Sequence, residues 1–571
     1  MNKIKTIDCL LIGHNDVDFQ EYEKNLRKMG MNSGAYRDLN LNFIWYENKP
    51  YSLSEMFNLL FHQESSSQSL HNKMNFCETF NAAIAYLGTY LNRRQFTFDY
   101  VNDFQEEKEE LAKKLEQENI RTIAITTTLY TSPLPIVEIM EFIKKHNRGA
   151  KIIIGGPFVS TQVRTLEPVQ LEYLWESLGA DYYVNSSQGE KALVNILTAL
   201  KDHCPLGGIP NIYYKTGNGY AAGPRVTENN ILSENMVNWD LFSPGPGRYV
   251  NVRTAISCPF SCAFCGFPEH AGKYQAVPAA AIEKELNLLA KIKSVKSIHF
   301  IDDTFNVPLK RFKDILKMLI KNKYTFKWHS HFRSQFSDRE TVELMKKSGC
   351  EGVFLGFESG NNQMLKKMNK AAAVEKYHEG IALLKEAGIT TFGSFIIGFP
   401  GETPGTVQDT VTFIEESEID FFRAQSWFCE HITPIWRDRK KYHLEGRSFE
   451  WKHETMDSYT AADLVEKIFL SVKNSVWVPQ YNFDFDNIFH LTDRGMTVDR
   501  VKSFLNSFNR GVREKMDFSD VPTDPNAPNV SLEVIKELMV ACGKPPHFDK
   551  AFVKPKEEKS DRLEKQISFE F

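Results

Sequence analysis

The chain has 571 residues, of which 42% are hydrophobic and 25% charged, and its formal net charge is −4. This length predicts two or three domains, and the near balance of charge argues against a nucleic-acid or anionic-membrane partner. No run approaches the roughly 18 apolar residues that a membrane span needs. The first residues lack an apolar signal region and six of the nine cysteines are scattered, so we expect a cytoplasmic protein with reduced thiols.

Strand and helix patterns alternate along the first 200 residues. Short apolar runs that end in glycine or polar loops predict strands at 6–13, 97–102, 121–126, 151–156 and 179–184. Helical spacing follows most of these runs, at 19–29, 106–118, 136–146 and 190–200. This order predicts an α/β fold with a doubly wound, Rossmann-like parallel sheet, which would bind its ligand at the carboxyl ends of the strands.

Three loops at those carboxyl ends carry residues suited to a large ligand. Residues 126–132 are small and mostly hydroxylated, and Gly155-Gly156-Pro157 allows a ligand to approach the backbone closely. Residues 187–190 (SQGE) open a helix, whose free N–H groups favour polar or anionic groups. A GxGxxG motif does not follow the first strand, which argues against a dinucleotide.

Two stretches interrupt the alternating pattern. Residues 33–92 include an aromatic run, a polar run at 63–68 and a predicted helix at 76–90, and we interpret them as an insertion that covers a cofactor or substrate. Residues 206–249 are rich in glycine, proline and asparagine and predict the domain boundary. The domains expected are 1–215, a linker at 216–248, 249–436 and 437–571.

The most specific motif is Cys258-x-x-x-Cys262-x-x-Cys265, with Phe264 before the last cysteine. Three thiolates on one tight loop can hold three irons of a 4Fe-4S cluster and leave the fourth open to a ligand. The alternative is a zinc knuckle, but structural zinc takes four ligands, usually as two separated pairs.

Repeated βα units follow this motif. Strands are predicted at 296–301, 325–330, 352–356, 391–398 and 421–426, and helices at 278–292, 339–348 and 374–387. This repetition predicts a barrel or partial barrel with its site at the strand carboxyl ends. The residues at those ends are Asp302, Asp303, Arg333, Glu358, Ser359 and Gly398.

The last third loses the βα pattern and predicts a mainly helical region. Amphipathic helices are expected at 459–476 and 497–515, separated by an aromatic stretch, and the tail from 554 has no periodicity. Cys429, Glu430 and His431 follow the last barrel strand and are candidates for a proton relay, although a short polar run is weak evidence for catalysis.

The cysteine spacing and its aromatic residue resemble the radical S-adenosylmethionine (radical SAM) enzymes, and the strand-end groups match that pattern over about 250–430. The resemblance implies a partial (β/α)6 barrel whose open iron binds SAM. It places SAM contacts at Phe264, Asp302, Asp303, Arg333, Glu358, Ser359 and Gly398. Many relatives have Arg-Gly before the first cysteine where this chain has Ile256-Ser257.

The N-terminal loops resemble the cobalamin-binding domain that precedes the barrel in cobalamin-dependent radical SAM enzymes. The resemblance implies cobalamin contacts at Asn15, Thr126, Thr127, Thr128, Tyr130, Gly155, Gly156, Pro157, Gly189 and Glu190. The DxHxxG motif of cobalamin-dependent mutases is missing, and His14 lacks its context. We therefore expect no protein imidazole on cobalt.

The combined resemblance implies a methyltransferase that transfers a methyl group from SAM, via cobalamin, to an unactivated carbon or phosphinate phosphorus in natural-product (antibiotic) biosynthesis. A small-molecule or peptide substrate and an external reductant such as flavodoxin or ferredoxin are implied with it. Residues 8–16 (DCLLIGHND) look similar to the PhpK-type P-methyltransferases.

Two other functions compete with methylation. The first is a non-methylating rearrangement or oxidation, and the second is a non-enzymatic cobalamin- or iron–sulfur-binding role. Methylthiotransfer is disfavoured, because that family carries three further N-terminal cluster cysteines that this sequence lacks.

Overall fold

The computed structural model describes residues 5–62, 74, 78–130, 132–242, 245–517 and 529–543. The predicted polar run at 63–68 and the tail from 554 lie outside the described residues, as does most of the segment before the helix predicted at 76–90. Within the described part of the chain, no helix has both the length and the apolar character needed to cross a bilayer.

The first sheet has seven strands in the order β10-β9-β8-β7-β6-β1-β5. Five of them are parallel and were predicted: β1 (Thr6–His14), β5 (Phe98–Asp103), β6 (Asn119–Thr126), β7 (Lys151–Gly155) and β8 (Tyr182–Val184). Their order reverses between β1 and β6, which is the switch point where such sheets bind ligands. The doubly wound α/β fold is confirmed.

An antiparallel hairpin extends this sheet beyond β8. Its strands are β9 (Ile212–Thr216) and β10 (Gly219–Ala222), and Gly217-Asn218 connects them. The predicted linker at 216–248 therefore starts inside a hairpin. A two-residue Gly-Asn connection between short strands is a hairpin signal, which the glycine-rich composition of the stretch obscured.

Apolar residues cover both faces of the first sheet, as expected for parallel strands. Leu10 and Ile12 belong to the core on one face, whereas Cys9 and Leu11 belong to the core on the other. The helices of this domain are α4 (Ala82–Asn92), α5 (Lys108–Gln117), α6 (Leu134–His146), α7 (Pro157–Thr165), α8 (Pro168–Leu178) and α9 (Glu190–Asp202).

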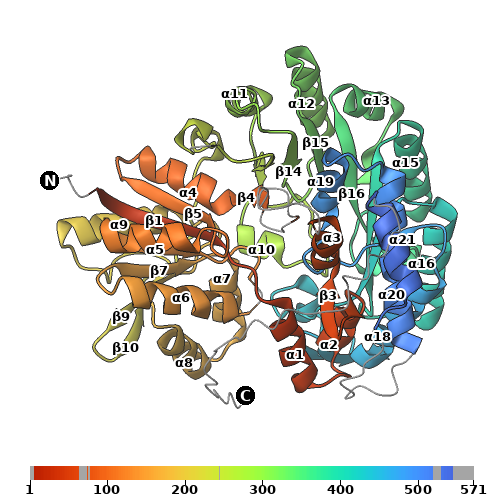
Figure 1. The fold of residues 1–571 in the computed structure, drawn as a ribbon, viewed down its shortest axis with the longest axis horizontal. Helices are drawn as coiled ribbons and strands as arrows, with labels where there is room; N and C mark the ends of the chain where they lie inside the picture. Colours follow the sequence, from red (N-terminus) through yellow and green to blue (C-terminus); the bar gives the residue numbers. More distant parts are fainter. Residues whose placement is uncertain are drawn as a thin grey trace.

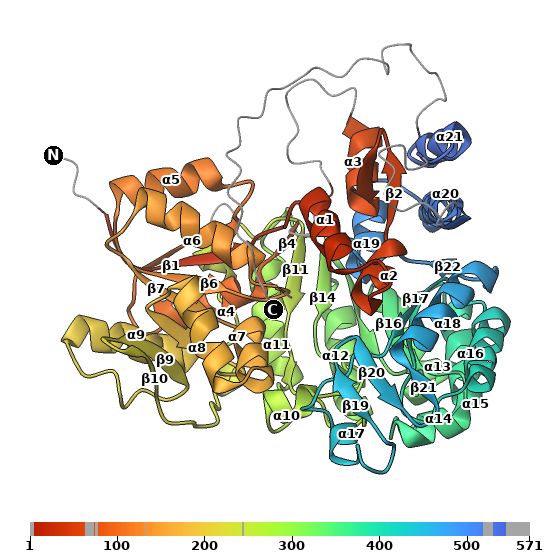
Figure 2. The same ribbon diagram turned by 90° about the horizontal axis from the view of Figure 1, so that it is seen from below.

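The second sheet has eight parallel strands in the order β22-β18-β17-β16-β15-β14-β11-β4. Its central six strands are β11 (Tyr249–Val252), β14 (Ser297–Phe300), β15 (Lys327–Phe332), β16 (Cys350–Glu358), β17 (Thr390–Ile397) and β18 (Phe421–Ser426). The helices that follow them are α11 (Ala279–Leu289), α12 (Leu309–Asn322), α13 (Arg339–Lys347), α14 (Asn362–Lys367), α15 (Val374–Glu386) and α16 (Pro404–Ser417). They lie on the outside of the curved sheet (Figure 2), which confirms the partial (β/α)6 barrel.

Distant segments supply the two edge strands of this barrel. Strand β4 (Thr79–Phe80) comes from the predicted insertion and pairs with β11, while β22 (Val476–Trp477) comes from the C-terminal region and pairs with β18. Helix α4, directly after β4, packs on the first sheet instead. The insertion thus joins the two sheets.

The rest of the N-terminal segment lies beside the C-terminal helices (Figure 1). It comprises α1 (Phe19–Met29), α2 (Gly34–Asn40), β2 (Phe43–Tyr46), β3 (Lys49–Ser52) and α3 (Leu53–His62). Two buried cations tie it there, since the Arg423 guanidinium donates to Asp38 Oδ1 over 2.8 Å and Lys515 Nζ donates to the Phe43 carbonyl over 2.7 Å. This segment is built into the C-terminal part of the molecule.

The C-terminal region is mainly helical, as predicted, but it also contains a small antiparallel sheet. Its helices are α17 (Pro434–Arg437), α18 (Ser458–Ser471), α19 (Phe485–Asp493), α20 (Val498–Asp517) and α21 (Leu532–Ala541). The sheet consists of β19 (Glu445–Arg447), β20 (Glu450–His453) and β21 (Met456–Asp457). Helix α19 begins within the aromatic stretch predicted only to separate two helices.

Candidate functional site

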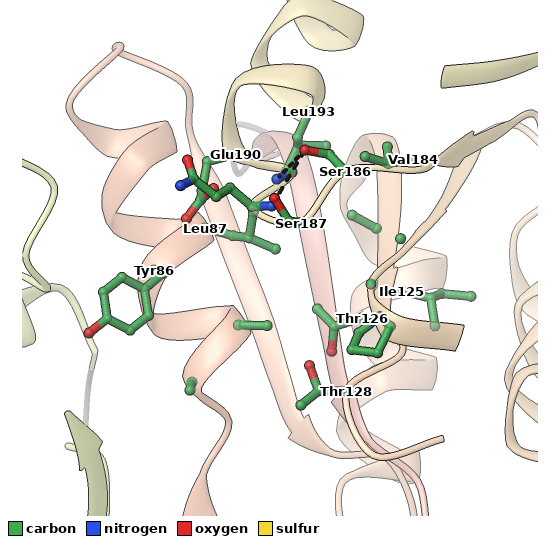
Figure 3. A pocket seen from close by; sticks show the side chains of 18 of the residues that line it. Tyr86, Leu87, Ile125, Thr126, Thr128, Val184, Ser186, Ser187, Glu190 and Leu193 are labelled. Carbon is green, nitrogen blue, oxygen red and sulfur yellow. Dashed lines mark hydrogen bonds between the residues drawn. The ribbon is translucent and has the colours of Figure 1, made fainter. Parts of the chain in front are cut away.

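A cavity of about 230 Å³ lies at the carboxyl ends of β6, β7 and β8, and Tyr86 and Leu87 of helix α4 line one side of it (Figure 3). Most of the residues predicted to contact cobalamin line it: Thr126, Thr128, Gly155, Gly156, Pro157, Gly189 and Glu190. Arg253, His270 and Ile301 of the barrel domain line it as well. Both domains therefore face one cavity.

Backbone geometry sets the shape of the β7 and β8 loops. Gly156 has a φ of +119°, and a Cβ at this position would lie 2.7 Å from Thr127 Oγ1, so any side chain is excluded. Gly189 has a φ of +81° and begins α9, while Ser186 Oγ accepts hydrogen bonds from the backbone N–H groups of residues 188 and 189. These loops hold their form through their own hydrogen bonds.

The remaining three predicted contacts lie outside the cavity lining. Thr127 donates its hydroxyl to the Gly155 carbonyl over 3.0 Å, and Tyr130 donates to the Gly13 carbonyl over 2.9 Å. The Asn15 side chain donates to the Pro135 carbonyl over 2.9 Å. They support the loops behind the cavity. His14 is also outside the lining, and burial lowers its pKa to about 4.

The lining is mainly apolar with a few polar groups, and it suits a ligand that lies close to the backbone. Thr126 Oγ1 is buried without a hydrogen-bond partner, so it is free to bond a ligand. The alanines of α4 (Ala82 and Ala83) and the glycines of the β7 loop leave room that larger side chains would fill. The residues present fit the predicted corrinoid.

The three cysteines lie on a loop whose two ends are held together. Strand β12 (Ala255–Ile256) leads into it and pairs antiparallel with β13 (Gln275–Ala276), and the short helix α10 (Phe267–Ala271) lies between them. The backbone N–H of Cys265 donates to the Cys262 carbonyl over 3.1 Å, and that of Ala263 donates to the Met368 carbonyl over 2.8 Å. The loop is thus closed on itself and docked on the segment after α14.

Cationic side chains surround the thiols. The Arg333 guanidinium lies 3.6 Å from Cys262 Sγ, and Lys370 pairs with Glu358 over 2.7 Å. Burial raises the pKa of Cys262, and Lys370 and Arg333 oppose that rise. Burial also raises the pKa of Cys265 to about 11, and the charges of Cys262 and Cys258 add to the rise.

Three thiols on one short loop, with Cys262 buried beside cations, fit an iron–sulfur cluster, because bound metal would remove their protons outright. The Nη1 atom of Arg333 is buried without a partner next to them, so it is a free donor for an anionic group.

The two neighbouring aspartates have different surroundings. Asp302 is buried, and its Oδ1 accepts hydrogen bonds from the backbone N–H groups of Thr254 (2.6 Å) and Ala255 (2.9 Å). Asp302 thus fixes the strand that leads into the cysteine loop. Asp303 is exposed, and its charge reaches Cys265.

The later strand ends also differ from one another. Glu358 has a φ of +66° at a bulge between β16 and β17, and it accepts a hydrogen bond from Lys370. Ser359 contacts Thr410 Oγ1 of α16 at 3.4 Å. A Cβ at Gly398 would lie 2.4 Å from the Trp451 ring, so this glycine permits packing against β20. Phe264 packs edge-on against Phe399.

The relay candidates Cys429, Glu430 and His431 make separate contacts. Cys429 pairs by its backbone with Ser448, and His431 lies 3.1 Å from the Gly446 carbonyl while stacking on Trp436. Glu430 alone is placed next to Gly266 of the cysteine loop.

Two residues at the junction of the domains were not predicted. Arg253 lies 3.4 Å from Glu190 and its guanidinium lies 4.3 Å from the Tyr86 ring centroid, while Tyr86 Oη accepts the Arg253 backbone N–H over 2.9 Å. Arg253 directly precedes the cysteine segment, so the sequence could have predicted its role from that position. The role of Tyr86 could not be predicted, because it depends on how the insertion folds back.

Comparison with known proteins agrees with this geometry. Residues 253–414 match the radical SAM superfamily, and residues 78–182 match the B12 binding domain. The chain is 26% identical over 318 residues to an uncharacterized methyltransferase (PH0819) of Pyrococcus horikoshii, covering 54% of this chain and 67% of that one. It is 26% identical over 354 residues to the anaerobic magnesium-protoporphyrin IX monomethyl ester cyclase of Rubrivivax gelatinosus, covering 58% of this chain and 60% of that one.

A solved structure of the cobalamin-dependent SAM radical enzyme OxsB, with aqua-cobalamin and SAM bound, shares the fold. Its TM-score is 0.54 at 14% identity, and the match covers 95% of this chain and 79% of that one. Regions matching the B12 binding domain and the radical SAM superfamily follow one another in this chain and line one cavity, and this pairing is similar to that of the cobalamin-dependent radical SAM enzymes.

Proposed function

We propose that this protein is a methyltransferase that uses a 4Fe-4S cluster, SAM and cobalamin to methylate an unactivated carbon or phosphinate phosphorus in natural-product biosynthesis. The observation that carries the proposal is the shared cavity, whose walls come from the B12 binding domain and from Arg253, His270 and Ile301 of the radical SAM domain. A radical site and a corrinoid site that face one cavity are arranged for the transfer of a methyl group to a substrate held between them.

The cofactors supply the chemistry: the cluster and SAM give a radical when bound, and cobalamin carries the methyl group. The protein holds and separates them. Cys258, Cys262 and Cys265 would hold the cluster, with Arg333 and Lys370 stabilising the thiolates. Asp302 keeps the strand before the loop in place.

The contact between domains would fix the distance between the two cofactors. Glu190 opens helix α9 of the first sheet, and its carboxylate meets Arg253 at the end of β11. Tyr86 of α4 packs on the same guanidinium. These three side chains therefore connect the corrinoid loops, the insertion and the strand that leads to the cysteines.

The atom methylated is the finer part of the proposal. The similarity of residues 8–16 to P-methyltransferases supports phosphorus, and a peptide or other small molecule methylated at carbon is equally compatible with the cavity. The reaction would need an external one-electron reductant such as flavodoxin or ferredoxin.

A second candidate is a cyclisation or other oxidation without methyl transfer. The 26% identity to an anaerobic magnesium-protoporphyrin IX monomethyl ester cyclase favours it. The two candidates differ in the fate of the SAM methyl group.

Anaerobic reconstitution with iron, sulfide and hydroxocobalamin, followed by assay with methyl-labelled SAM and candidate phosphinates, separates them. Methylation predicts both S-adenosylhomocysteine and 5′-deoxyadenosine, with label in the product. Oxidation predicts 5′-deoxyadenosine and an unlabelled product. Protein that retains no cobalamin after this treatment would contradict both candidates.

A further inference from the structure

A cluster of histidines and carboxylates lies on the inner face of the barrel. His299 of β14 and His329 of β15 stand opposite each other in the parallel register, so their side chains leave the sheet on the same side. Phe485 and Asp486 of α19 cover them, and the Phe485 ring packs edge-on against His329 with centroids 5.4 Å apart. His329 precedes Arg333 by four residues, which is about 13 Å along an extended strand.

Three side chains in this cluster converge on one point. Asp486 directs Oδ2 to Nδ1 of His299 at 3.0 Å and Oδ1 to Nε2 of His329 at 3.2 Å. Among the histidine, cysteine, aspartate and glutamate side chains that the structure describes, one group of three has ligand atoms that all lie within 4.8 Å of one another. This group is His299, His329 and Asp486. Two imidazoles and a carboxylate are a donor set that divalent transition metals take.

A second carboxylate orients His329 for such a role. Glu351 Oε1 lies 3.1 Å from Nδ1 of His329, and the Ser297 hydroxyl donates to the same carboxylate. If His329 is neutral and donates its Nδ1 proton to Glu351, its Nε2 lone pair faces Asp486. The Nε2 atom and the carboxylate oxygen at 3.2 Å then need a cation between them, which is either a second proton on the imidazole or a metal ion.

A divalent ion would also satisfy the charge balance of this cluster. Asp486 and Glu351 bring two negative charges into a space where His329 is only 2% exposed. Buried charges need compensation, and a divalent ion with neutral imidazoles would balance both carboxylates at once.

We propose that His299, His329 and Asp486 bind one Zn²⁺ ion, separate from the cysteine cluster and with a structural role. The ion would hold α19, and with it the C-terminal region, to the inner face of β14 and β15. A water molecule would complete the coordination, since zinc takes four ligands.

The test uses the full-length chain with Cys258→Ala, Cys262→Ala and Cys265→Ala combined, so that no iron–sulfur cluster contributes metal. After growth with added zinc and exhaustive dialysis, elemental analysis should find about one zinc ion per chain. Adding His299→Ala or Asp486→Asn should lower the zinc content per chain at least about fivefold. His490→Gln, which changes another buried histidine of α19, should leave it unchanged.

Cobalt substitution gives a second readout that needs no activity. The triple-cysteine variant should show visible d–d absorption with Co²⁺, and the same variant with Asp486→Asn added should lose it. Zinc at background level in a triple-cysteine variant with native circular dichroism would overturn the proposal and leave an ion pair bridged by a proton. Equal zinc with and without Asp486→Asn would overturn it too, since the metal would then lie elsewhere.

Discussion

The corrinoid-facing loops of the first sheet and the strand ends of the barrel are built in different ways. The first are formed by glycine, proline and small hydroxylated residues, and most of those predicted do line the cavity. The second carry charged side chains, and several of these bond to the protein itself: Asp302 to the strand before the cysteines, and Arg333 to the Lys370 carbonyl.

Sites of the first kind can be predicted from a sequence more readily than sites of the second kind. A loop shaped by backbone is set by residues next to one another, such as Gly155 and Gly156, so its form follows from local rules. A charged side chain has many possible partners, and the fold chooses among them. Asp302 and Asp303 are adjacent in the sequence, yet Asp302 is buried and accepts backbone hydrogen bonds, whereas Asp303 is exposed.

The largest effect is expected at the cysteine loop. Replacing Cys258, Cys262 or Cys265 by alanine should lower SAM cleavage by at least about 1,000-fold, because each thiolate holds one iron. The exposed Cys204 provides the control, and Cys204→Ala should keep normal activity. The measurement is 5′-deoxyadenosine formed per reconstituted protein. Normal cleavage in any of the three variants would contradict the assignment.

The two adjacent aspartates are expected to have different roles. Asp302 stabilises the cysteine loop, whereas Asp303 is available to a ligand. Asp302→Ala removes the acceptor for two backbone N–H groups, and it should lower both bound iron and SAM cleavage about 10- to 100-fold. Asp303→Ala should leave bound iron unchanged and lower only SAM cleavage. Iron content and 5′-deoxyadenosine are measured on the same samples. Equal iron loss in both variants would remove the distinction between them.

The cavity loops are tested at Gly156. Gly156→Ala places a Cβ against Thr127 at a positive φ, which costs about 1 to 3 kcal/mol and should weaken cobalamin binding about tenfold. Gly208→Ala is the matched control, since a Cβ there meets no atom within 4 Å. Cobalamin absorbance after reconstitution and gel filtration measures both. Unchanged binding in Gly156→Ala would show that the loop backbone does not shape the site.

A smaller, pH-dependent effect is expected where the segment between the sheets packs on the barrel. Glu285 of α11 is buried and accepts a hydrogen bond from the Trp239 indole over 3.0 Å, and burial raises its pKa from 4.5 to about 8. Folding therefore takes up a proton between those pH values, so stability falls as the pH rises through this range.

Glu285→Gln should match the natural protein near pH 5 and exceed it by on the order of 1 to 2 kcal/mol near pH 8. Thermal unfolding at the two pH values measures this. Glu283→Gln, on the same helix but less buried, should show no such pH dependence. A Glu285→Gln variant that is less stable at pH 8 would show that the carboxylate is bound in its charged form.

Much of the fold could be predicted because its periodic elements are local. The strands β1, β6 and β7 and the barrel repeats followed from apolar runs and their spacing. The place of the segment from α1 to α3 could not, because its partners Arg423 and Lys515 come hundreds of residues later. The same holds for Tyr86, which reaches Arg253 only after the insertion folds across both sheets.

The central claim is that the two domains work on one cavity to transfer a methyl group. It is tested most directly without a substrate, by giving reduced, reconstituted protein methyl-labelled SAM and measuring S-adenosylhomocysteine together with label retained by the protein. Methyl transfer predicts that both appear in proportion to bound cobalamin and fall in Gly156→Ala. 5′-Deoxyadenosine formed without any S-adenosylhomocysteine, at the same rate with and without cobalamin, would contradict the claim.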